Sequence, residues 1–540
     1  MKQFNMIDAP QGPDPKRLMI AVVVTSAVLM LYSYFFAPAP PPPKEEAPAQ
    51  VETKEELKQE RAKEDTAAHA QATKGLSLVT TSFSVKEPGE KALWRASYNV
   101  TMSNQGALIS MYTLTDFSHE KPLWEEKATG SFLLGLSSKN PLVTLANDAP
   151  YEVLSQDQRH VAYRHVTKEG LFIVRRYEFL ENARIDETIT FKNLSDKPLK
   201  GEFALLAEKN GKKGEEPGLM NPGVQGEALV VKTSTLHERM SFSDILYAAF
   251  DEQFFLSAIL PREQAFLERV DLKVSPLPDE GHKATIELIL KPFVLVPSEE
   301  KSFTHQLFIG PKQVDLLASI KPPLDENIDF GWFGILSRPM LWLLVQIYNV
   351  VHNYGLAIII ITFIIKLLTY PLTQKSFSSQ QAMKELQPKI KGLQQKYGHD
   401  RTLLGQKQME LYKTEGINPL AGCLPILIQL PIWFAFFQML RSSVELFDQP
   451  FYGWITDLTL PDRYYVLPVL MGASMMIQQL FTPTPADQPQ MKYVMLAMPI
   501  FLTFIMLNMP SGLSLYILTN NLLTILQQII IKRQAVKVSK

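Results

Sequence analysis

Long apolar runs dominate the second half of the chain, whereas apolar and polar residues alternate over much of the first half. A helix that crosses the hydrocarbon core of a bilayer needs about 17 to 25 mainly apolar residues. Runs of this length cover 18–36, 355–373, 420–440, 464–481, 492–508 and 513–531. The pattern therefore predicts one N-terminal membrane helix and a cluster of five more near the C-terminus.

The first apolar run, 18–36, follows a segment, 1–17, that ends in Lys16 and Arg17. A cleaved signal peptide is the alternative, because residues 37–39 are similar to a cleavage site. The length of the run and Pro40 after that site both favour an uncleaved anchor, and the basic flank favours a cytoplasmic N-terminus. Segment 37–74 is rich in Pro, Ala and charge, which predicts an extended linker without a core.

Between residues 75 and 325 the hydrophobic period changes to two, which is typical of half-buried strands. The alternation is clearest in 188–192, 269–274 and 284–290. Turn signals lie at 104–106, 193–196 and 221–223. We expect a large antiparallel β-supersandwich in 75–325, with a short helix after Pro311 that ends at Lys321-Pro322-Pro323.

Segment 327–353 is apolar, but Arg338-Pro339 interrupts it and leaves a piece that is short for a membrane span. If it crossed the membrane, the lysine-rich segment after residue 373 would be exported, against the positive-inside rule. We therefore predict an interfacial helix on the outer surface of the membrane.

Segment 374–418 carries eight Lys and Arg residues against four acidic residues, so it belongs in the cytoplasm. Residues 397–400 divide it into two helical stretches, which predicts a helical hairpin. It is either a solvated connector or a docking platform, and the sequence favours neither. The remaining loops alternate accordingly: 441–463 on the outer side, and loop 482–491 and the basic tail 532–540 in the cytoplasm.

One cation, Lys366, lies inside the apolar run 355–373. An ammonium at the centre of the bilayer costs at least about 2.5 to 3.5 kcal/mol, so such residues usually face a bundle interior or a water-filled cavity. The alternative is that the lysine stem reaches the nearer headgroups. Polar residues in the other runs, such as Gln429 and those in 519–528, either bond helices together or line a hydrated groove with Lys366.

Composition excludes several classes of site. The 540 residues have a formal net charge of −1 and one cysteine, Cys423, so the chain has no disulfide framework. The scattered histidines have no metal-ligand spacing, and no phosphate-binding loop or nucleophile motif is present. We expect no metal, no cofactor, no specific nucleic-acid site and no enzymatic activity.

Three stretches, 361–373, 418–437 and 509–528, resemble the YidC/Oxa/Alb family of membrane protein insertases. Segment 330–344 and the large domain after the first run resemble the YidC branch from bacteria with two membranes. The resemblance implies a polytopic α-helical core of five helices beside the anchor, a periplasmic β-supersandwich and a hydrophilic groove that opens to the cytoplasm and to lipid but is closed to the periplasm. Lys366 matches the groove cation, a position where the family most often has arginine.

The resemblance also implies further groove-lining residues, namely Thr362, Gln429, Tyr516 and Asn520, and a hydrophobic exit wall formed by Trp433, Met471 and Ile505. It implies a bacterial inner-membrane location with both termini in the cytoplasm. The implied partners are nascent membrane proteins, lipid, the Sec translocon (SecYEG and SecDF) and the ribosome through the cytoplasmic loops.

Two other function classes stay open at this point. An ion-coupled transporter would need an acidic partner inside the membrane, and the five clustered runs contain no internal Asp or Glu. A membrane-tethered carbohydrate-active enzyme would place its site in the sandwich domain.

Overall fold

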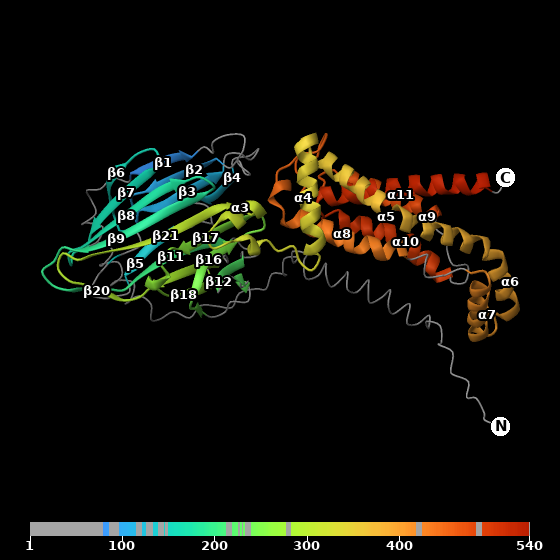
Figure 1. Ribbon diagram of the computed structural model, residues 1–540, viewed down its shortest axis with the longest axis horizontal. Helices are drawn as coiled ribbons and strands as arrows, with labels where there is room; N and C mark the ends of the chain where they lie inside the picture. Colours follow the sequence, from blue (N-terminus) through green and yellow to red (C-terminus); the bar gives the residue numbers. More distant parts are fainter. Residues whose placement is uncertain are drawn as a thin grey trace, which may run out of the picture.

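The structure is a computed structural model that describes residues 79–85, 97–114, 121–125, 133–138, 145, 149–211, 219–224, 227–228, 231–232, 239–276, 282–416, 424–481 and 489–538. The predicted anchor, its flanking segments 1–17 and 37–74, and most of loop 482–491 lie outside these residues. In the described part, a β-domain and a helical hairpin lie at opposite ends of a helical bundle (Figure 1).

The β-domain is built from antiparallel sheets, the largest of which has ten strands. These are β6 (Glu152–Gln156), β7 (His160–Val166), β8 (Leu171–Leu180), β9 (Arg184–Asn193), β12 (Leu219–Val224), β13 (Glu227–Ala228), β14 (Val231–Lys232), β16 (Ile245–Asp251), β17 (Phe255–Pro261) and β21 (Glu300–Pro311). The predicted strand 188–192 lies in β9, where buried and half-buried residues alternate along the whole strand. This alternation places one face of the sheet in the sandwich core.

Two smaller sheets share that core with the ten-stranded sheet. One has five strands, β5 (Leu133–Ser138), β11 (Phe203–Gly211), β15 (Met240–Phe242), β18 (Leu267–Pro276) and β19 (His282–Leu290), and the other has four, β1 (Thr80–Val85), β2 (Tyr98–Ser103), β3 (Leu108–Leu114) and β4 (Lys121–Glu125). A short pair joins β10 (Leu199–Gly201) to β20 (Phe293–Leu295). The strands predicted at 269–274 and 284–290 are confirmed as β18 and β19.

The turn predicted at 221–223 is wrong, because these residues lie within β12 and pair with β16. Pro222 and Gly223 lie within the strand and do not reverse the chain. A Cβ atom on Gly223 would overlap the ring of Tyr247, so glycine lets the two strands approach. The register shifts between Gly223 and Val224, as at a β-bulge.

Strands β16 and β17 are buried on both faces. Ala248 and Phe250 belong to the sandwich core, whereas Tyr247 and Ala249 belong to a second apolar cluster that continues into the helical bundle. The second face is covered in part by α3 (Val314–Ser319), the short helix predicted after Pro311. Burial on both sides explains why β17 is apolar at every position except Ser257 and does not alternate.

The helical part comprises α4 (Gly334–Val351), α5 (Tyr354–Glu385), α6 (Gln387–Tyr397), α7 (Arg401–Thr414), α8 (Leu424–Ser442), α9 (Val466–Phe481), α10 (Pro489–Met506) and α11 (Ser511–Val538). Each clustered apolar run lies largely within one of these helices, and α5 and α11 continue beyond the runs. Among the described residues, α4, α5 and part of α11 are long and apolar enough to cross a membrane, while α9 and α10 hold shorter apolar stretches.

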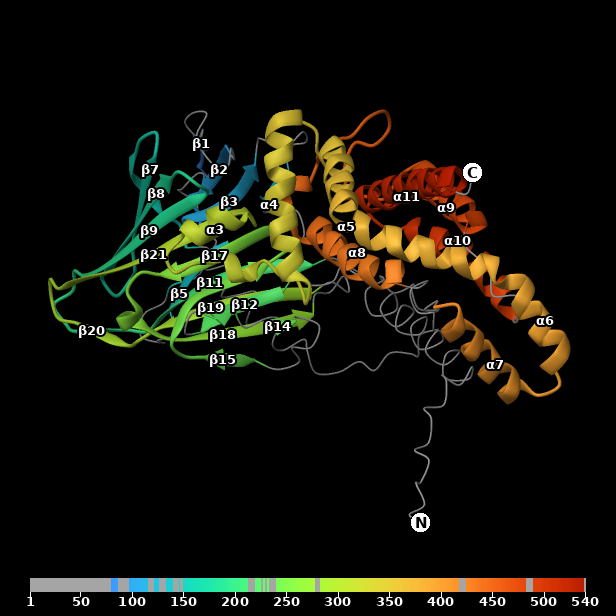
Figure 2. The same cartoon turned by 45° about the vertical axis from the view of Figure 1, so that its right-hand side comes forward.

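Helix α4 meets the criterion for a span by length and composition, so its interfacial placement stays a prediction. It runs crosswise to α11 in two views and lies at the end of the bundle that faces the β-domain (Figures 1 and 2). Ile335 and Trp342 are exposed along it, and Trp332 is exposed two residues before it begins.

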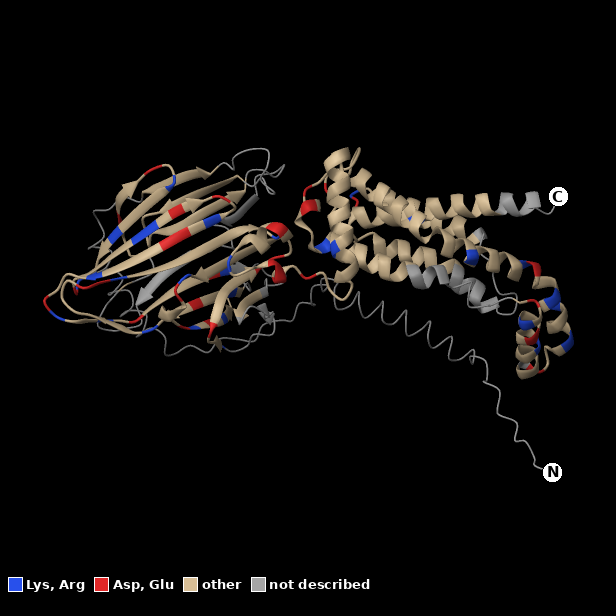
Figure 3. Cartoon of the chain, viewed as in Figure 1, with Lys and Arg blue, Asp and Glu red and all other residues tan. Residues whose placement is uncertain are grey.

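The predicted hairpin is formed by α6 and α7, and its first arm continues directly from α5. The break predicted at 397–400 is confirmed, because α6 ends at Tyr397 and Asp400 caps α7 by accepting hydrogen bonds from the N–H groups of Thr402 and Leu403 at 2.9 and 3.0 Å. Charged residues are dense on this hairpin and sparse in the bundle (Figure 3).

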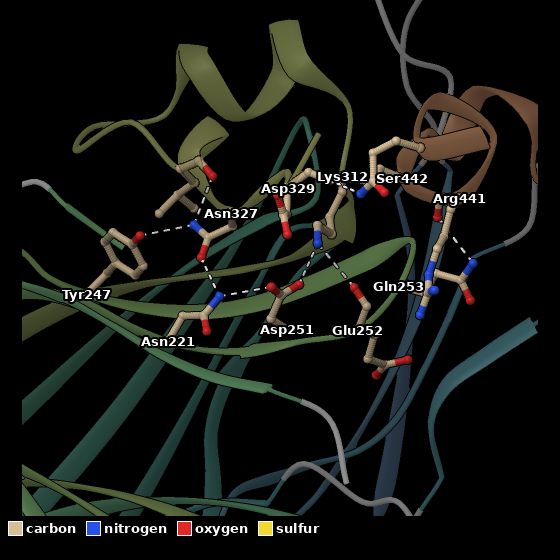
Figure 4. A network of polar contacts seen from close by, with 12 residues as sticks. Asn221, Tyr247, Asp251, Glu252, Gln253, Lys312, Asn327, Asp329, Arg441 and Ser442 are labelled. Atoms are coloured by element: carbon tan, nitrogen blue, oxygen red, sulfur yellow. Dashed lines mark hydrogen bonds and ion pairs between the residues drawn. The ribbon is translucent and has the colours of Figure 1, made fainter. Parts of the chain in front are cut away.

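A polar network joins the β-domain to the segment that leads into the bundle (Figure 4). The ammonium of Lys312 lies 2.6 Å from Oδ1 of Asp251, and Asn221 Nδ2 donates to Oδ2 of Asp251 at 2.9 Å. Asn221 also donates to Asn327, which donates in turn to the hydroxyl of Tyr247 at 3.0 Å. The network fixes the 3-10 turn η3 (Asp325–Asn327) against the large sheet.

Candidate functional site

Lys366 lies on the inward face of α5. The helix begins at an Asn353 cap, whose side-chain oxygen accepts a hydrogen bond from the N–H of Leu356 at 2.9 Å. Positions three and four residues apart share one face of a helix. The face that contains Lys366 is polar over Thr362, Lys366, Thr369, Thr373, Ser376 and Gln380.

The polarity of α5 is the reverse of that of a helix in a soluble protein. Thr362 and Ser376 of the polar face are buried, whereas Phe363, Leu367 and Leu368 are exposed. Helices that are apolar outside and polar inside suit a bilayer around a polar interior. Lys366 itself is half-buried, and among the described residues no side chain forms a hydrogen bond or ion pair with its ammonium.

The predicted groove residues on α8 and α11 meet each other. Gln429 Nε2 donates to the hydroxyl of Tyr516 at 2.6 Å, and the Tyr516 ring stacks on Phe436 with centroids 4.3 Å apart. Asn520 is half-buried one turn after Tyr516. Both α8 and α11 contact α5, which carries Lys366.

Thr362 differs from the other predicted groove residues. Its side chain is buried, and its hydroxyl donates to the carbonyl of Ile358 in the same helix at 2.6 Å. The hydroxyl is therefore satisfied within α5, and Thr362 offers little to a groove next to it.

The three residues expected on the exit wall have different environments. Trp433 and Ile505 are half-buried and pack against the apolar cluster of the bundle. Met471 is only 1% exposed, so its side chain lies inside the bundle. Its neighbours Val469 and Leu470 are the exposed apolar residues of that turn of α9.

Two polar contacts join helices of the bundle, and their partners on α5 and α9 were not singled out from the sequence. Gln527 Nε2 of α11 donates to Thr373 Oγ1 of α5 at 2.8 Å, and Asn521 Nδ2 donates to Ser474 Oγ of α9 at 3.1 Å. They bond α11 to α5 and to α9. The three- and four-residue spacing of polar side chains along α5 was the signal that could have located Thr373.

The described residues contain no group of three or more His, Cys, Asp or Glu side chains that could hold a metal ion. The geometry that remains is a half-buried cation on a polar face of α5. This helix contacts α8 and α11, which carry the hydrogen-bonded pair Gln429 and Tyr516. Such a site can attract and hold a polar or acidic group, and it offers no nucleophile or acid–base pair.

Comparison with known proteins covers nearly the whole described chain. Residues 95–343 match the family described as YidC periplasmic domain, and residues 346–538 match the family described as 60Kd inner membrane protein. The chain is 35% identical over 466 residues to the membrane protein insertase YidC of Geobacter sp. (strain M21), with 84% of each protein covered.

Two further proteins are similar to this chain. The YidC protein of Geobacter sulfurreducens is 44% identical over 288 residues, which cover 53% of each protein. A crystal structure of an active YidC insertase with its first transmembrane domain resolved is 17% identical, with a TM-score of 0.37, and covers 82% of this chain and 93% of that one.

Proposed function

This chain belongs to the YidC family of membrane protein insertases, and we propose that it inserts its clients through a polar groove in which Lys366 is the attracting cation. The family acts in the inner membrane, carries a periplasmic domain and is an insertase rather than an enzyme. The β-domain is therefore periplasmic, and nascent membrane proteins are the substrates.

The observation that carries the proposal is the reversed polarity of α5 around Lys366. A charge on the inward face of a membrane helix is costly unless a counter-charge or water reaches it. Since no described side chain pairs with Lys366, we propose that an acidic or polar segment of the client supplies the counter-charge. Two unit charges 4 Å apart attract by about 4 kcal/mol at an effective dielectric constant of 20, which is enough to bias the path of such a segment.

The apolar helix of the client would leave the groove along the lipid-facing surface. Trp433 and Ile505 support this part of the proposal, because both are half-buried at the edge of the apolar cluster. Gln429, Tyr516 and Asn520 would form the polar lining, and Met471 would act only through packing.

We further propose that the chain works alone on small clients and beside the Sec translocon, SecYEG and SecDF, on larger ones. The α6–α7 hairpin and the cytoplasmic loops would contact the ribosome, and both termini would lie in the cytoplasm. The density of charge on the hairpin supports this placement.

Substitution of Lys366 tests the electrostatic step. Lys366→Arg should retain insertion because arginine keeps the charge, whereas Lys366→Ala should weaken insertion and Lys366→Glu should weaken it about tenfold or more, the equivalent of about 1.4 kcal/mol. Insertion of a client with an acidic N-terminal segment is measured in cells depleted of the endogenous insertase.

Lys375→Glu is the matched control, because Lys375 is exposed on the same helix and should tolerate the change. Full insertion by the Lys366→Glu variant would rule out the attraction.

A further inference from the structure

The 3-10 turn η5 (Val444–Leu446), in the loop that follows α8, is inserted between the β-domain and the helical bundle. The side chain of Val444 belongs to the apolar core of the β-domain, whereas the side chain of Leu446 belongs to the apolar cluster of the bundle. Both side chains are buried. The residue between them, Glu445, therefore lies where the two parts of the molecule meet.

Two contacts on either side of η5 hold the loop against the β-domain. The ring of Phe447 packs against Phe254 and Phe255, with centroid distances of 5.0 and 5.5 Å. Gln253 Nε2 donates to the carbonyl of Arg441 at 3.1 Å (Figure 4). The β-domain is thus docked on the bundle through this loop, and because the β-domain is periplasmic, the loop lies on the periplasmic side.

The Glu445 carboxyl group has an environment that suits its neutral form. Its side chain is half-buried, its Oε2 atom is buried, and no described residue forms a hydrogen bond with that atom. The charge that acts on the carboxyl belongs to Asp315 of α3, which is another acid. A buried carboxylate without a counter-charge is costly, and a like charge nearby increases the cost.

The other titratable groups around η5 come from each element packed on it. Tyr354, at the start of α5, interacts with the charge of Glu445, and its phenol is neutral at pH 7. Arg441 and Asp448 flank η5 within the loop, and across the junction Lys312 is engaged by Asp251 at 2.6 Å. The groups whose charge interacts with Glu445 are therefore an acid and a phenol, and neither offers it a positive charge.

This environment separates the docked and undocked states by their protons. Burial raises the pKa of Glu445 to about 7; its own N–H opposes the rise, and Asp315 adds to it. Once exposed to water, the same carboxyl has an ordinary pKa of about 4.5. Docking is therefore favoured in full below about pH 4.5 and weakens as the pH rises toward 7, because the undocked state releases its proton first.

We propose that Glu445 is a proton-dependent latch between the periplasmic β-domain and the helical bundle. With the carboxyl neutral, η5 stays inserted between the two apolar clusters and the β-domain is docked. When the carboxyl loses its proton, its charge draws the turn toward water and weakens the contacts of Phe447 with the β-domain. The latch does not depend on Lys366, and it couples the position of the β-domain to the pH of the periplasm.

Hydrogen–deuterium exchange of the full-length chain in lipid nanodiscs tests the latch, read by mass spectrometry over residues 441–450. The N–H of Phe447 donates to the carbonyl of Val444 at 3.0 Å, so its exchange reports whether η5 is intact. After correction for the intrinsic pH dependence of exchange, this segment should exchange about tenfold faster at pH 8 than at pH 5, which corresponds to a pKa difference of about one unit between the two states.

Two substitutions change the latch in known directions. Glu445→Gln keeps the shape of the neutral carboxyl without a titrating proton, so the segment should exchange slowly at both pH values. Asp315→Asn, at an exposed position of α3, removes the nearby negative charge and should reduce the ratio of the two rates. Glu300→Gln is the matched control, because Glu300 is exposed at the opposite end of β21 from the junction, and it should keep the tenfold ratio.

A distance measurement in the chain with Glu445 intact covers a substitution that folds poorly. Spin labels are attached at Leu194→Cys in the β-domain and Val350→Cys in α4, both exposed positions, in a Cys423→Ser background. The distribution of distances between the labels should be narrow at pH 5 and should broaden toward longer distances at pH 8.

Equal corrected exchange and equal distances at the two pH values would overturn the latch. A tenfold ratio that persists in Glu445→Gln would also overturn it, because another group, such as Asp251, would then be responsible. Lys366→Ala should keep the pH dependence while it reduces insertion, so the latch and the attracting cation fail separately.

Discussion

Arg175 is a guanidinium with no exposed surface inside the β-domain. Its Nε donates to Glu187 Oε1 at 2.6 Å, and its Nη1 donates to the carbonyl of Gly106 at 2.7 Å. His305 Nε2 lies 3.0 Å from the second oxygen of Glu187. These residues join β8, β9 and β21 to the turn between β2 and β3, where Gly106 has a φ of 72°.

Burial alone would raise the pKa of Glu187, but Arg175 and then His305 outweigh burial and lower it to about 2. A carboxyl group with a lowered pKa stabilises the folded state above its unfolded pKa of about 4.5, and this contribution is lost as the pH falls toward 2. The β-domain should therefore lose thermal stability between these pH values, as measured by near-ultraviolet circular dichroism.

Glu187→Gln should remove that acid dependence and, at pH 7, lower the free energy of unfolding by roughly 3 to 5 kcal/mol, because Arg175 is left buried without its carboxylate. The same acid sensitivity in the variant and the unmodified chain would contradict the role of Glu187.

At the residue scale, the sequence indicated which side chains are chemically unusual better than it indicated how buried each side chain is. Lys366 could be identified from the sequence because a cation in an apolar run is conspicuous. In the structure it lies on the polar face of α5. Met471 was placed on the exit wall from resemblance alone, and nothing in its local pattern distinguishes the buried side of α9 from the exposed one. Thr362 was also assigned from resemblance alone, and only the structure shows that its hydroxyl donates a hydrogen bond within its own helix.

At the scale of elements, the polar contact between α5 and α11 has a measurable energy. Hydrogen bonds between membrane helices average about 0.6 kcal/mol and reach about 1.7 kcal/mol. A double-mutant cycle of Thr373→Val and Gln527→Leu should therefore give a coupling energy within this range for thermal unfolding in detergent.

Thr369→Val is the control for that cycle. The Thr369 hydroxyl donates to the carbonyl of Ile365 in its own helix at 2.9 Å, so its coupling with Gln527→Leu should be close to zero. Equal coupling for Thr369 and Thr373 would mean that the contact between the helices is not the cause.

Periodicity predicted the strands that have one face in the core and one in solvent, such as β9 and β19. It could not predict that 221–223 form part of β12, because the choice of Gly223 depends on the Tyr247 ring of the next strand. Helix lengths were also underestimated, since the polar residues that follow Leu372 continue α5 rather than end it.

At the scale of the whole molecule, Lys312 and Asp251 are a buried pair at the junction between the β-domain and the bundle. Burial raises the pKa of Asp251, and Lys312 opposes that rise. Lys312→Met should lower the free energy of unfolding by roughly 3 to 5 kcal/mol, because it leaves Asp251 buried without its counter-charge.

The loss should be larger at pH 8 than at pH 5, since a carboxyl group with a raised pKa destabilises the fold as the pH rises through that pKa. The second substitution Asp251→Asn should recover part of the stability. Lys192→Met is the control at an exposed pair and should change stability by less than about 0.5 kcal/mol. A loss that does not depend on pH would indicate a packing effect instead.

Run lengths and loop charges predicted the division into a β-domain, a helical bundle and a cytoplasmic hairpin. They could not predict which loop the β-domain contacts, because Gln253 and Phe447 have ordinary neighbours in the sequence and meet only in the fold. The predicted anchor 18–36 lies outside the described residues.

Helix α5 has 32 residues, which corresponds to about 48 Å at 1.5 Å per residue, and it passes without a break from the Asn353 cap to the start of the hairpin. It is a stiff rod, so a force applied at the hairpin tip is transmitted along its axis to the turn that carries Lys366. Pro371 is the one residue in this rod that removes a backbone hydrogen bond, and bending concentrates at such positions. Pro371 is therefore one site of bending between the hairpin and the ammonium, five residues from the charge, and the boundary between α5 and α6 at Leu386 is another.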